Sequence, residues 1–156
     1  MATDFDTATE DTLGELDALL AGRKNDWWDS FYENRAKPCP FFGTYPDESL
    51  AKWIDEGQIR PGRALDLGCG NGRNAIFLSR SGFATEGVDY SQTAINWGRD
   101  RATEAGVDVL LRHESVFELE LEAGSYDLVT RPTYLPATAV RWRDRQATRR
   151  VPPSRS

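Results

Sequence analysis

Histidine, cysteine and methionine are scarce in this sequence, and long apolar runs are absent. It contains one histidine, His113, two cysteines and one methionine. One histidine without a paired-cysteine motif argues against a metal site, and two cysteines give no disulfide framework. No apolar run approaches the ~20 residues of a membrane span, and the acidic N-terminus lacks the basic and apolar regions of a signal peptide. These absences predict a cytoplasmic protein with no bound metal and no membrane contact.

Length and composition predict one folded domain with a body and a tail of opposite charge. The chain has 156 residues, 39% of them hydrophobic, which is enough for one packed core. Residues 1–129 carry 24 acidic and 12 basic side chains, whereas residues 130–156 carry one acidic side chain and seven arginines. Such a change between segments indicates either a binding tail or a foreign one.

The most informative stretch is Ala-Leu-Asp-Leu-Gly-Cys-Gly-Asn-Gly at residues 64–72. An apolar run with one acid, Asp66, ends in three glycines at alternate positions, and a segment with helical character follows. Glycines permit positive φ in a tight turn and let the backbone approach a ligand closely. A strand, a glycine turn and a helix together are typical of the first unit of a dinucleotide-binding fold.

Strands and helices alternate along the rest of the body. We expect strands over 64–67, 83–88, 107–111 and 126–129, and helices over 47–56, 72–81 and 92–105, the last capped by Ser91. This alternation predicts an α/β fold, a Rossmann-like parallel sheet flanked by helices with about four strands. A further helix is expected from Thr12, and Pro38–Gly43 should be extended.

The segment 25–35 is unusually aromatic, and two interpretations of it stay open. A helix could lie on the core through Trp27, Trp28 and Phe31, because aromatic side chains are usually buried. Alternatively, the segment could be a lid in which Tyr32 or Trp28 covers a bound ligand. We therefore divide the chain into an N-terminal helix and aromatic segment (1–43), a Rossmann-like domain (44–129) and a tail (130–156).

A second acid lies at the end of the second predicted strand. Asp89 follows Asp66 by 23 residues, and a carboxylate at a strand end can accept hydrogen bonds from both hydroxyls of a ribose. Asp89 could instead only cap the helix over 92–105. The spacing Gly68-x-Gly70-x-Gly72 differs from the G-x-G-x-x-G of nicotinamide enzymes, which disfavours a nicotinamide-binding oxidoreductase.

The motif around Asp66 and the stretch Gly87–Ser91 resemble the first two motifs of class I S-adenosylmethionine-dependent methyltransferases. The wider pattern, with Trp28-Asp-x-x-Tyr32 and Tyr126–Val129, is similar to bacterial small-molecule methyltransferases of the thiopurine and tellurite-resistance type. The resemblance implies S-adenosylmethionine as cofactor and S-adenosylhomocysteine as product. The cofactor-binding residues that it implies are Tyr32, Asp66, Gly68, Cys69, Gly70, Asn71, Asp89, Tyr90, Ser115 and Val116.

The resemblance stops after Val129, where the family pattern has further strands. Residues 130–156 contain four prolines and seven arginines, and we expect them to be disordered. A shifted reading frame or another truncation is the favoured explanation, because the composition changes abruptly where a buried strand should end. The alternatives are a tail that binds nucleic acid, which the acidic body would repel, and a solvated tail without a role. In a truncated chain the fourth strand would be an open sheet edge through which the chain could self-associate.

The expected function is methyl transfer from S-adenosylmethionine to a small-molecule acceptor. The sequence names no catalytic base, and it does not identify the acceptor. His113 is more readily assigned to the core or the surface than to catalysis. The alternative is a catalytically inactive module that binds S-adenosylmethionine or S-adenosylhomocysteine.

Overall fold

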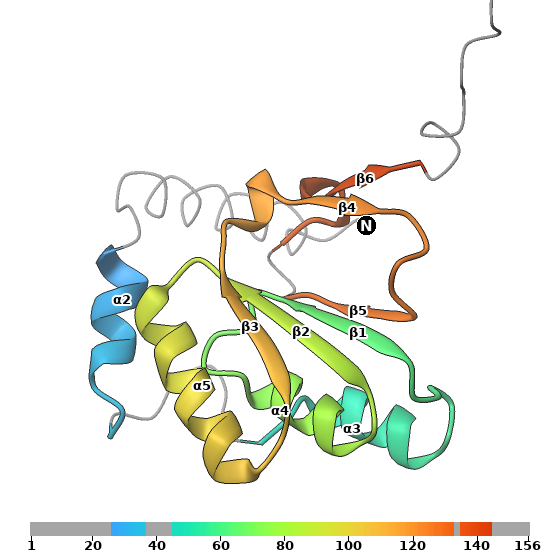
Figure 1. The fold of residues 1–156 in the computed structure, drawn as a ribbon, viewed down its shortest axis with the longest axis horizontal. Helices are drawn as coiled ribbons and strands as arrows, with labels where there is room; N and C mark the ends of the chain where they lie inside the picture. Colours follow the sequence, from blue (N-terminus) through green and yellow to red (C-terminus); the bar gives the residue numbers. More distant parts are fainter. Residues whose placement is uncertain (1–25, 37–44, 133–134, 145–156) are drawn as a thin grey trace, which may run out of the picture.

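Four parallel strands form the central sheet. The computed structural model describes residues 26–36, 45–132 and 135–144. The strands are β1 (Arg63–Leu67), β2 (Ala84–Asp89), β3 (Val109–His113) and β5 (Leu128–Thr130), in the order β3-β2-β1-β5 (Figure 1). The chain order reverses between β1 and β5, as it does at the ligand-binding edge of doubly wound sheets. The predicted α/β sheet of about four strands is confirmed.

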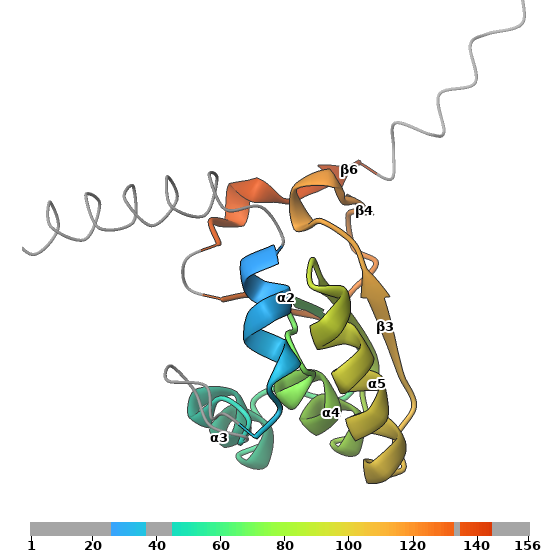
Figure 2. The same ribbon diagram turned by 90° about the vertical axis from the view of Figure 1, so that its left-hand side faces the viewer.

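The helices cover one face of this sheet. Figure 2 shows α2 (Asp26–Glu33), α3 (Glu48–Asp55), α4 (Arg73–Arg80) and α5 (Gln92–Ala105) on the same side. Two apolar clusters join α3, α4 and α5 to the strands, and α2 packs against α5. The first contains Leu50, Ala64, Leu78 and Phe83, and the second contains Cys69, Ala75, Ile95 and Leu111.

Local capping signals locate two of the helix starts correctly. The Ser91 side chain accepts a hydrogen bond from the backbone N–H of Ala94 at 3.1 Å, and Asp47 accepts one from that of Leu50 at 3.0 Å. Such side chains satisfy N–H groups that have no partner inside the helix. The predicted α3 and α5 are therefore confirmed, with α5 beginning and ending where the sequence places it.

The segment after β3 covers part of the other face and corrects one expectation. It forms η1 (Val116–Glu118), β4 (Glu120–Glu122), η2 (Ala137–Ala139) and β6 (Arg141–Arg143), and β4 pairs with β6 in parallel. Leu135 and Val140 are only 4% and 7% exposed, and they pack in a cluster with Leu65, Leu67 and Val88.

Residues 135–144 thus differ from the disordered tail that we expected. The prediction of disorder relied on the proline- and arginine-rich composition of residues 130–156, and it overlooked Leu135 and Val140, which are buried against the sheet. The strands β4 and β6 were missed because three residues are too few to show a period of two. The predictions for residues 1–25, 37–44 and 145–156, including the helix from Thr12, lie outside the described residues.

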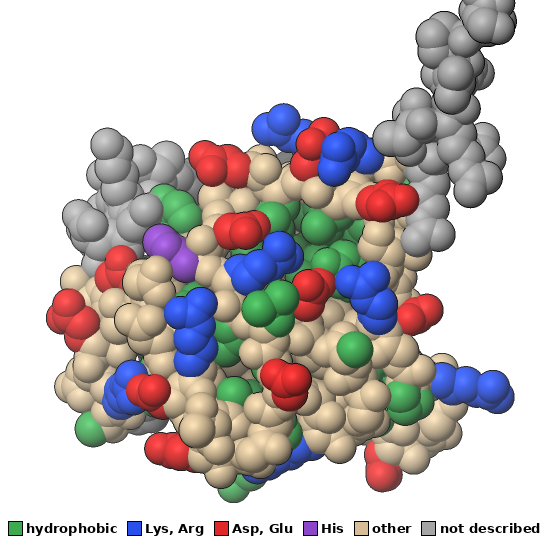
Figure 3. Space-filling view, viewed as in Figure 1, with side chains coloured by type: hydrophobic (Ala, Val, Ile, Leu, Met, Phe, Trp, Pro, Cys, Tyr) green, Lys and Arg blue, Asp and Glu red, His purple; other side chains and the backbone are tan. Residues whose placement is uncertain are grey.

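The strand β5 lies at one edge of the described sheet, next to β1. On the face turned away from the helices, hydrophobic side chains are visible between charged ones (Figure 3). Leu110 of β3 is among the exposed apolar side chains, with 55% of its surface accessible. Within the described ranges, no helix combines the length and apolar character that a membrane span requires.

Candidate functional site

The glycine turn joins β1 to α4 at the carboxyl ends of β1 and β2. Gly68, Gly70 and Gly72 have φ values of +65°, +55° and +82°, in a region that side chains with a β-carbon rarely adopt. The turn therefore needs glycine at all three positions. It also places backbone close to the two acids that the sequence singles out, Asp66 in β1 and Asp89 at the end of β2.

Asp66 is buried, with 4% of its surface exposed, and its Oδ1 accepts a hydrogen bond of 2.8 Å from Thr130 Oγ1. Burial and the negative charge of Asp89 raise the pKa of Asp66 from 3.8 to about 7, although Thr130 and Arg73 act to lower it. Sequence reasoning missed Thr130, which we assigned to the tail. Its only sequence signal is a polar residue at the end of the last apolar strand.

Asp89 is half-buried and holds the glycine turn directly. Its Oδ2 accepts a hydrogen bond from the Gly70 N–H and its Oδ1 accepts one from the Ser91 N–H, both at 2.8 Å. Burial raises the pKa of Asp89 although these N–H groups oppose it. Each carboxylate oxygen has a second lone pair, so Asp89 can still accept hydrogen bonds from a ligand.

Tyr32 reaches the same turn from α2. Its side chain is 5% exposed, and a β-carbon built on Gly70 would lie 2.6 Å from its hydroxyl oxygen. The Tyr32 ring also packs edge-on against Trp97 of α5, with ring centroids 6.2 Å apart. The helix α2 therefore packs against α5 and reaches the glycine turn, whereas the covering of a ligand by Tyr32 or Trp28 stays a prediction.

Cys69 and Asn71 line the turn through their backbones, because their side chains are engaged elsewhere. Cys69 is 6% exposed and packs in the cluster with Ala75, Ile95 and Leu111. Burial raises the pKa of its thiol well above the usual value, and the nearby carboxylates add to this effect. The thiol is thus not an activated nucleophile. Asn71 Oδ1 accepts a hydrogen bond of 2.9 Å from Arg101 of α5.

The remaining predicted site residues lie after β2 and β3. Tyr90 is 39% exposed, and its carbonyl oxygen lies 2.9 Å from Nε2 of the exposed His113. Ser115 precedes η1 and is half-buried, whereas the Val116 side chain is 8% exposed and belongs to the core. Val116 can therefore face a ligand only through its backbone.

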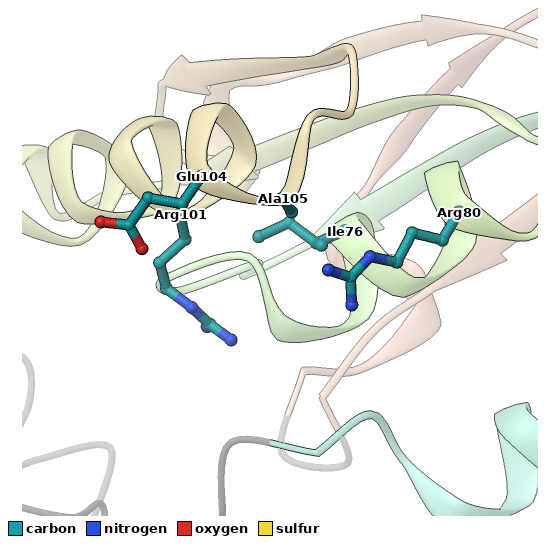
Figure 4. Close-up of a pocket in the computed structure, with 5 residues that line it drawn as sticks. All are labelled: Ile76, Arg80, Arg101, Glu104 and Ala105. Carbon is teal, nitrogen blue, oxygen red and sulfur yellow. The ribbon is translucent and has the colours of Figure 1, made fainter.

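A pocket of about 230 Å³ lies elsewhere, between α4 and α5 (Figure 4). It is lined by Ile76, Arg80, Arg101, Glu104 and Ala105. None of these is a predicted site residue. Two of its lining residues touch the glycine turn: Arg101 donates a hydrogen bond to Asn71, and the Ile76 N–H donates one to the Gly72 carbonyl.

Known proteins resemble this chain in sequence and in fold. A family model described as a methyltransferase domain matches residues 64–150. A ubiquinone biosynthesis O-methyltransferase of Bordetella avium is 36% identical over 121 residues, covering 74% of this chain and 46% of that protein. The enzyme of the same name from Hahella chejuensis is 35% identical over 106 residues, covering 67% and 42%. The chain thus spans about half the length of the curated relatives it matches.

A solved structure is also similar to this chain in fold. A solved structure from work on the conversion of a disulfide bond into a thioacetal group during echinomycin biosynthesis superposes with a TM-score of 0.61. Its sequence is 28% identical to this one, and the match covers 70% of this chain and 46% of that chain.

Proposed function

Because this chain belongs to the class I S-adenosylmethionine-dependent methyltransferase family, we propose that it binds S-adenosylmethionine at the glycine turn and transfers its methyl group to a small-molecule acceptor. The chain covers 46% of the Bordetella relative, so the activity of that whole protein is a proposal for this chain. The cofactor is the better supported part of the proposal, because its predicted contacts lie within residues 32–116.

The observation that carries the proposal is a pair of buried carboxylates beside a glycine turn. Burial raises the pKa of both Asp66 and Asp89, and the charge of Asp89 also raises the pKa of Asp66. No ion pair involves either carboxylate among the described residues. A ligand with positive charge lowers the cost of ionising them, whereas the pyrophosphate of a dinucleotide would raise it. S-adenosylmethionine carries an ammonium and a sulfonium and no phosphate, so these residues fit it.

Each predicted residue then has a role that suits its place. Asp89 accepts the ribose hydroxyls, and Asp66 orients the ammonium end of the methionine portion. The backbone of Gly68–Gly70 lies along the ligand because no β-carbons stand in the way. Tyr32 covers the turn from α2, while Tyr90 and the backbone of Ser115 and Val116 bound the adenine.

When bound, S-adenosylmethionine supplies a methyl group that an acceptor lone pair takes as the carbon–sulfur bond breaks, leaving neutral S-adenosylhomocysteine. The protein's task is to align the acceptor with that carbon and to keep water out. The names of the relatives in Bordetella and Hahella support an oxygen atom of a small molecule as the acceptor.

Calorimetric titration with S-adenosylhomocysteine tests the cofactor site. We expect one-to-one binding that weakens about 10- to 100-fold in Asp89→Asn, since this change removes a charged acceptor of hydrogen bonds. Asp108→Asn is the matched control, because Asp108 is exposed and lies just before β3, at the opposite end of the strands. Absence of binding by the folded wild-type chain would refute the proposal.

An acceptor screen with labelled S-adenosylmethionine tests the transfer step. Transfer of label to a phenol or another hydroxyl compound supports the enzyme. Binding of S-adenosylhomocysteine without transfer to any acceptor would favour the catalytically inactive binding module instead.

A further inference from the structure

Asp29 is a carboxylate of α2 to which the proposed function gives no role. Its Oδ1 accepts a hydrogen bond of 2.5 Å from Ser91 Oγ and one of 3.1 Å from the Thr93 N–H. Burial raises the pKa of Asp29, but the hydrogen bonds from Ser91 and Thr93 outweigh burial and leave that pKa below its usual value. Asp29 is therefore ionised at neutral pH and bound to the first turn of α5.

A continuous series of hydrogen bonds leads from Asp29 to the glycine turn. Ser91, which is fully buried, donates its hydroxyl to Asp29 and its backbone N–H to Asp89. Asp89 in turn accepts the Gly70 N–H at 2.8 Å. Asp29 therefore sets the position of the residue that orients the proposed ribose acceptor.

The same helix returns to the turn through a second residue. Tyr32 follows Asp29 by three positions, so the two side chains lie on neighbouring parts of one helix face. The Tyr32 hydroxyl lies against Gly70, as the 2.6 Å approach to a built β-carbon shows. The helix α2 thus reaches the site at two points: Asp29 binds Ser91, which binds Asp89, and Tyr32 lies against Gly70.

A second polar contact with α5 lies at the surface and comes from Arg35, two residues after the end of α2. Arg35 Nη1 lies 2.9 Å from Asp100 Oδ2, but both side chains are about half exposed to solvent. Exposed ion pairs of this kind contribute little to stability. Asp29, by contrast, accepts part-buried hydrogen bonds from the start of α5, beside Asp89.

We propose that Asp29 is a positioning residue that fastens α2 to the start of α5 and so holds Tyr32 and Asp89 in place around the cofactor. This inference rests on the proposed function of the site. It accounts for the acid in the Trp28-Asp-x-x-Tyr32 pattern: the acid binds the helix start, and the tyrosine three residues later covers the turn.

Calorimetric titration with S-adenosylhomocysteine tests the proposal in three variants of the full chain. Asp29→Ala removes both hydrogen bonds and should weaken binding about 5- to 30-fold. Asp29→Asn keeps a carbonyl oxygen that accepts both hydrogen bonds, so it should restore affinity to within about 3-fold of wild type. Asp100→Asn of α5 breaks the exposed ion pair with Arg35 and should leave the affinity unchanged. Equal affinity in Asp29→Ala and wild type would overturn the proposal.

Hydrogen exchange without ligand separates this proposal from the function on which it rests. In Asp29→Ala we expect faster exchange both in residues 26–33 and in residues 68–72, while the thermal midpoint stays within a few degrees of wild type. Faster exchange confined to residues 26–33 would overturn the positioning role, because the glycine turn would then be independent of α2. If exchange is faster in both segments of Asp29→Ala but the wild-type chain does not bind S-adenosylhomocysteine, the proposed function alone is refuted.

Discussion

Replacing Asp66 by asparagine should make the protein more stable while weakening the proposed cofactor site. Asp66 is 4% exposed, and burial raises its pKa from 3.8 to about 7. Asparagine has nearly the same shape, and its carbonyl oxygen can accept the 2.8 Å hydrogen bond from Thr130. The variant therefore removes a buried charge and keeps the packing.

The magnitude follows from the difference between the folded and unfolded pKa. Well below pH 4 Asp66 is protonated in both the folded and the unfolded chain, so its titration does not change the free energy of unfolding. Between pH 4 and 7 the unfolded chain loses the proton first, and the folded state becomes progressively less stable. Above pH 7 the cost is constant at about 4 kcal/mol, from about 1.4 kcal/mol for each unit between 3.8 and 7. Structural relaxation lowers this value, so we expect about 2–4 kcal/mol.

Urea unfolding at pH 5 and pH 8 measures the effect directly. The free energy of unfolding of Asp66→Asn should exceed that of wild type by about 2–4 kcal/mol at pH 8. At pH 5 this excess should be smaller by about 1–2 kcal/mol. Asp108→Asn, an exposed control at the far end of the strands, should change little at either pH. A variant less stable than wild type at pH 8, or a difference that does not change with pH, would refute the reasoning.

The same variant should bind S-adenosylhomocysteine more weakly. An ionised carboxylate pairs with an ammonium, whereas a neutral amide does not. For the wild type, affinity should fall as pH decreases below 7, because Asp66 must lose its proton before it can pair with the ligand. Unchanged affinity in Asp66→Asn would remove Asp66 from the site.

Three further predictions concern the turn, the C-terminal segment and the sheet edge. Gly70→Ala should lose about 1–3 kcal/mol of stability, because φ is +55° and the new methyl group would lie 2.6 Å from the Tyr32 hydroxyl. The loss should be smaller in a Tyr32→Phe background. Equal losses in both backgrounds would argue against this contact. Leu135→Ala should cost about 2–4 kcal/mol in urea unfolding, while the exposed Thr138→Ala costs under 0.5 kcal/mol; a neutral Leu135→Ala would support the disordered tail instead. The β5 edge should make the sedimentation coefficient rise with protein concentration, and one constant value over a tenfold range would exclude association through it.

The sequence predicted best the features whose causes are local. The glycine turn is set by three residues that tolerate positive φ, and α5 begins at a serine whose side chain caps it and ends at Gly106, which has a φ of +66°. Each of these signals acts within a few residues along the chain. The four parallel strands follow from them, because short strands alternating with helices leave little choice of architecture.

The contacts that build the site were harder to predict, because they join residues far apart in the chain. Thr130 meets Asp66 across 64 positions, and Ser91 meets Asp29 across 62. A single threonine or aspartate forms no repeating pattern in the sequence, so a distant hydrogen-bond partner cannot be predicted from it. Leu135 and Val140 were missed for a related reason, since two apolar residues in a proline- and arginine-rich stretch do not alter its average composition.

The features that oppose stability in this fold meet at one place. Two carboxylates that burial makes costly, a turn that requires glycine and a tyrosine pressed against that turn all lie at the carboxyl ends of β1 and β2. The strands beneath them are packed with Leu65, Leu67 and Val88, which are almost fully buried. A fold selected for stability alone would favour asparagine over Asp66, as the predicted gain of about 2–4 kcal/mol indicates. We therefore infer that Asp66 binds a positively charged ligand, and that this interaction offsets the free-energy cost of burying an ionised carboxylate.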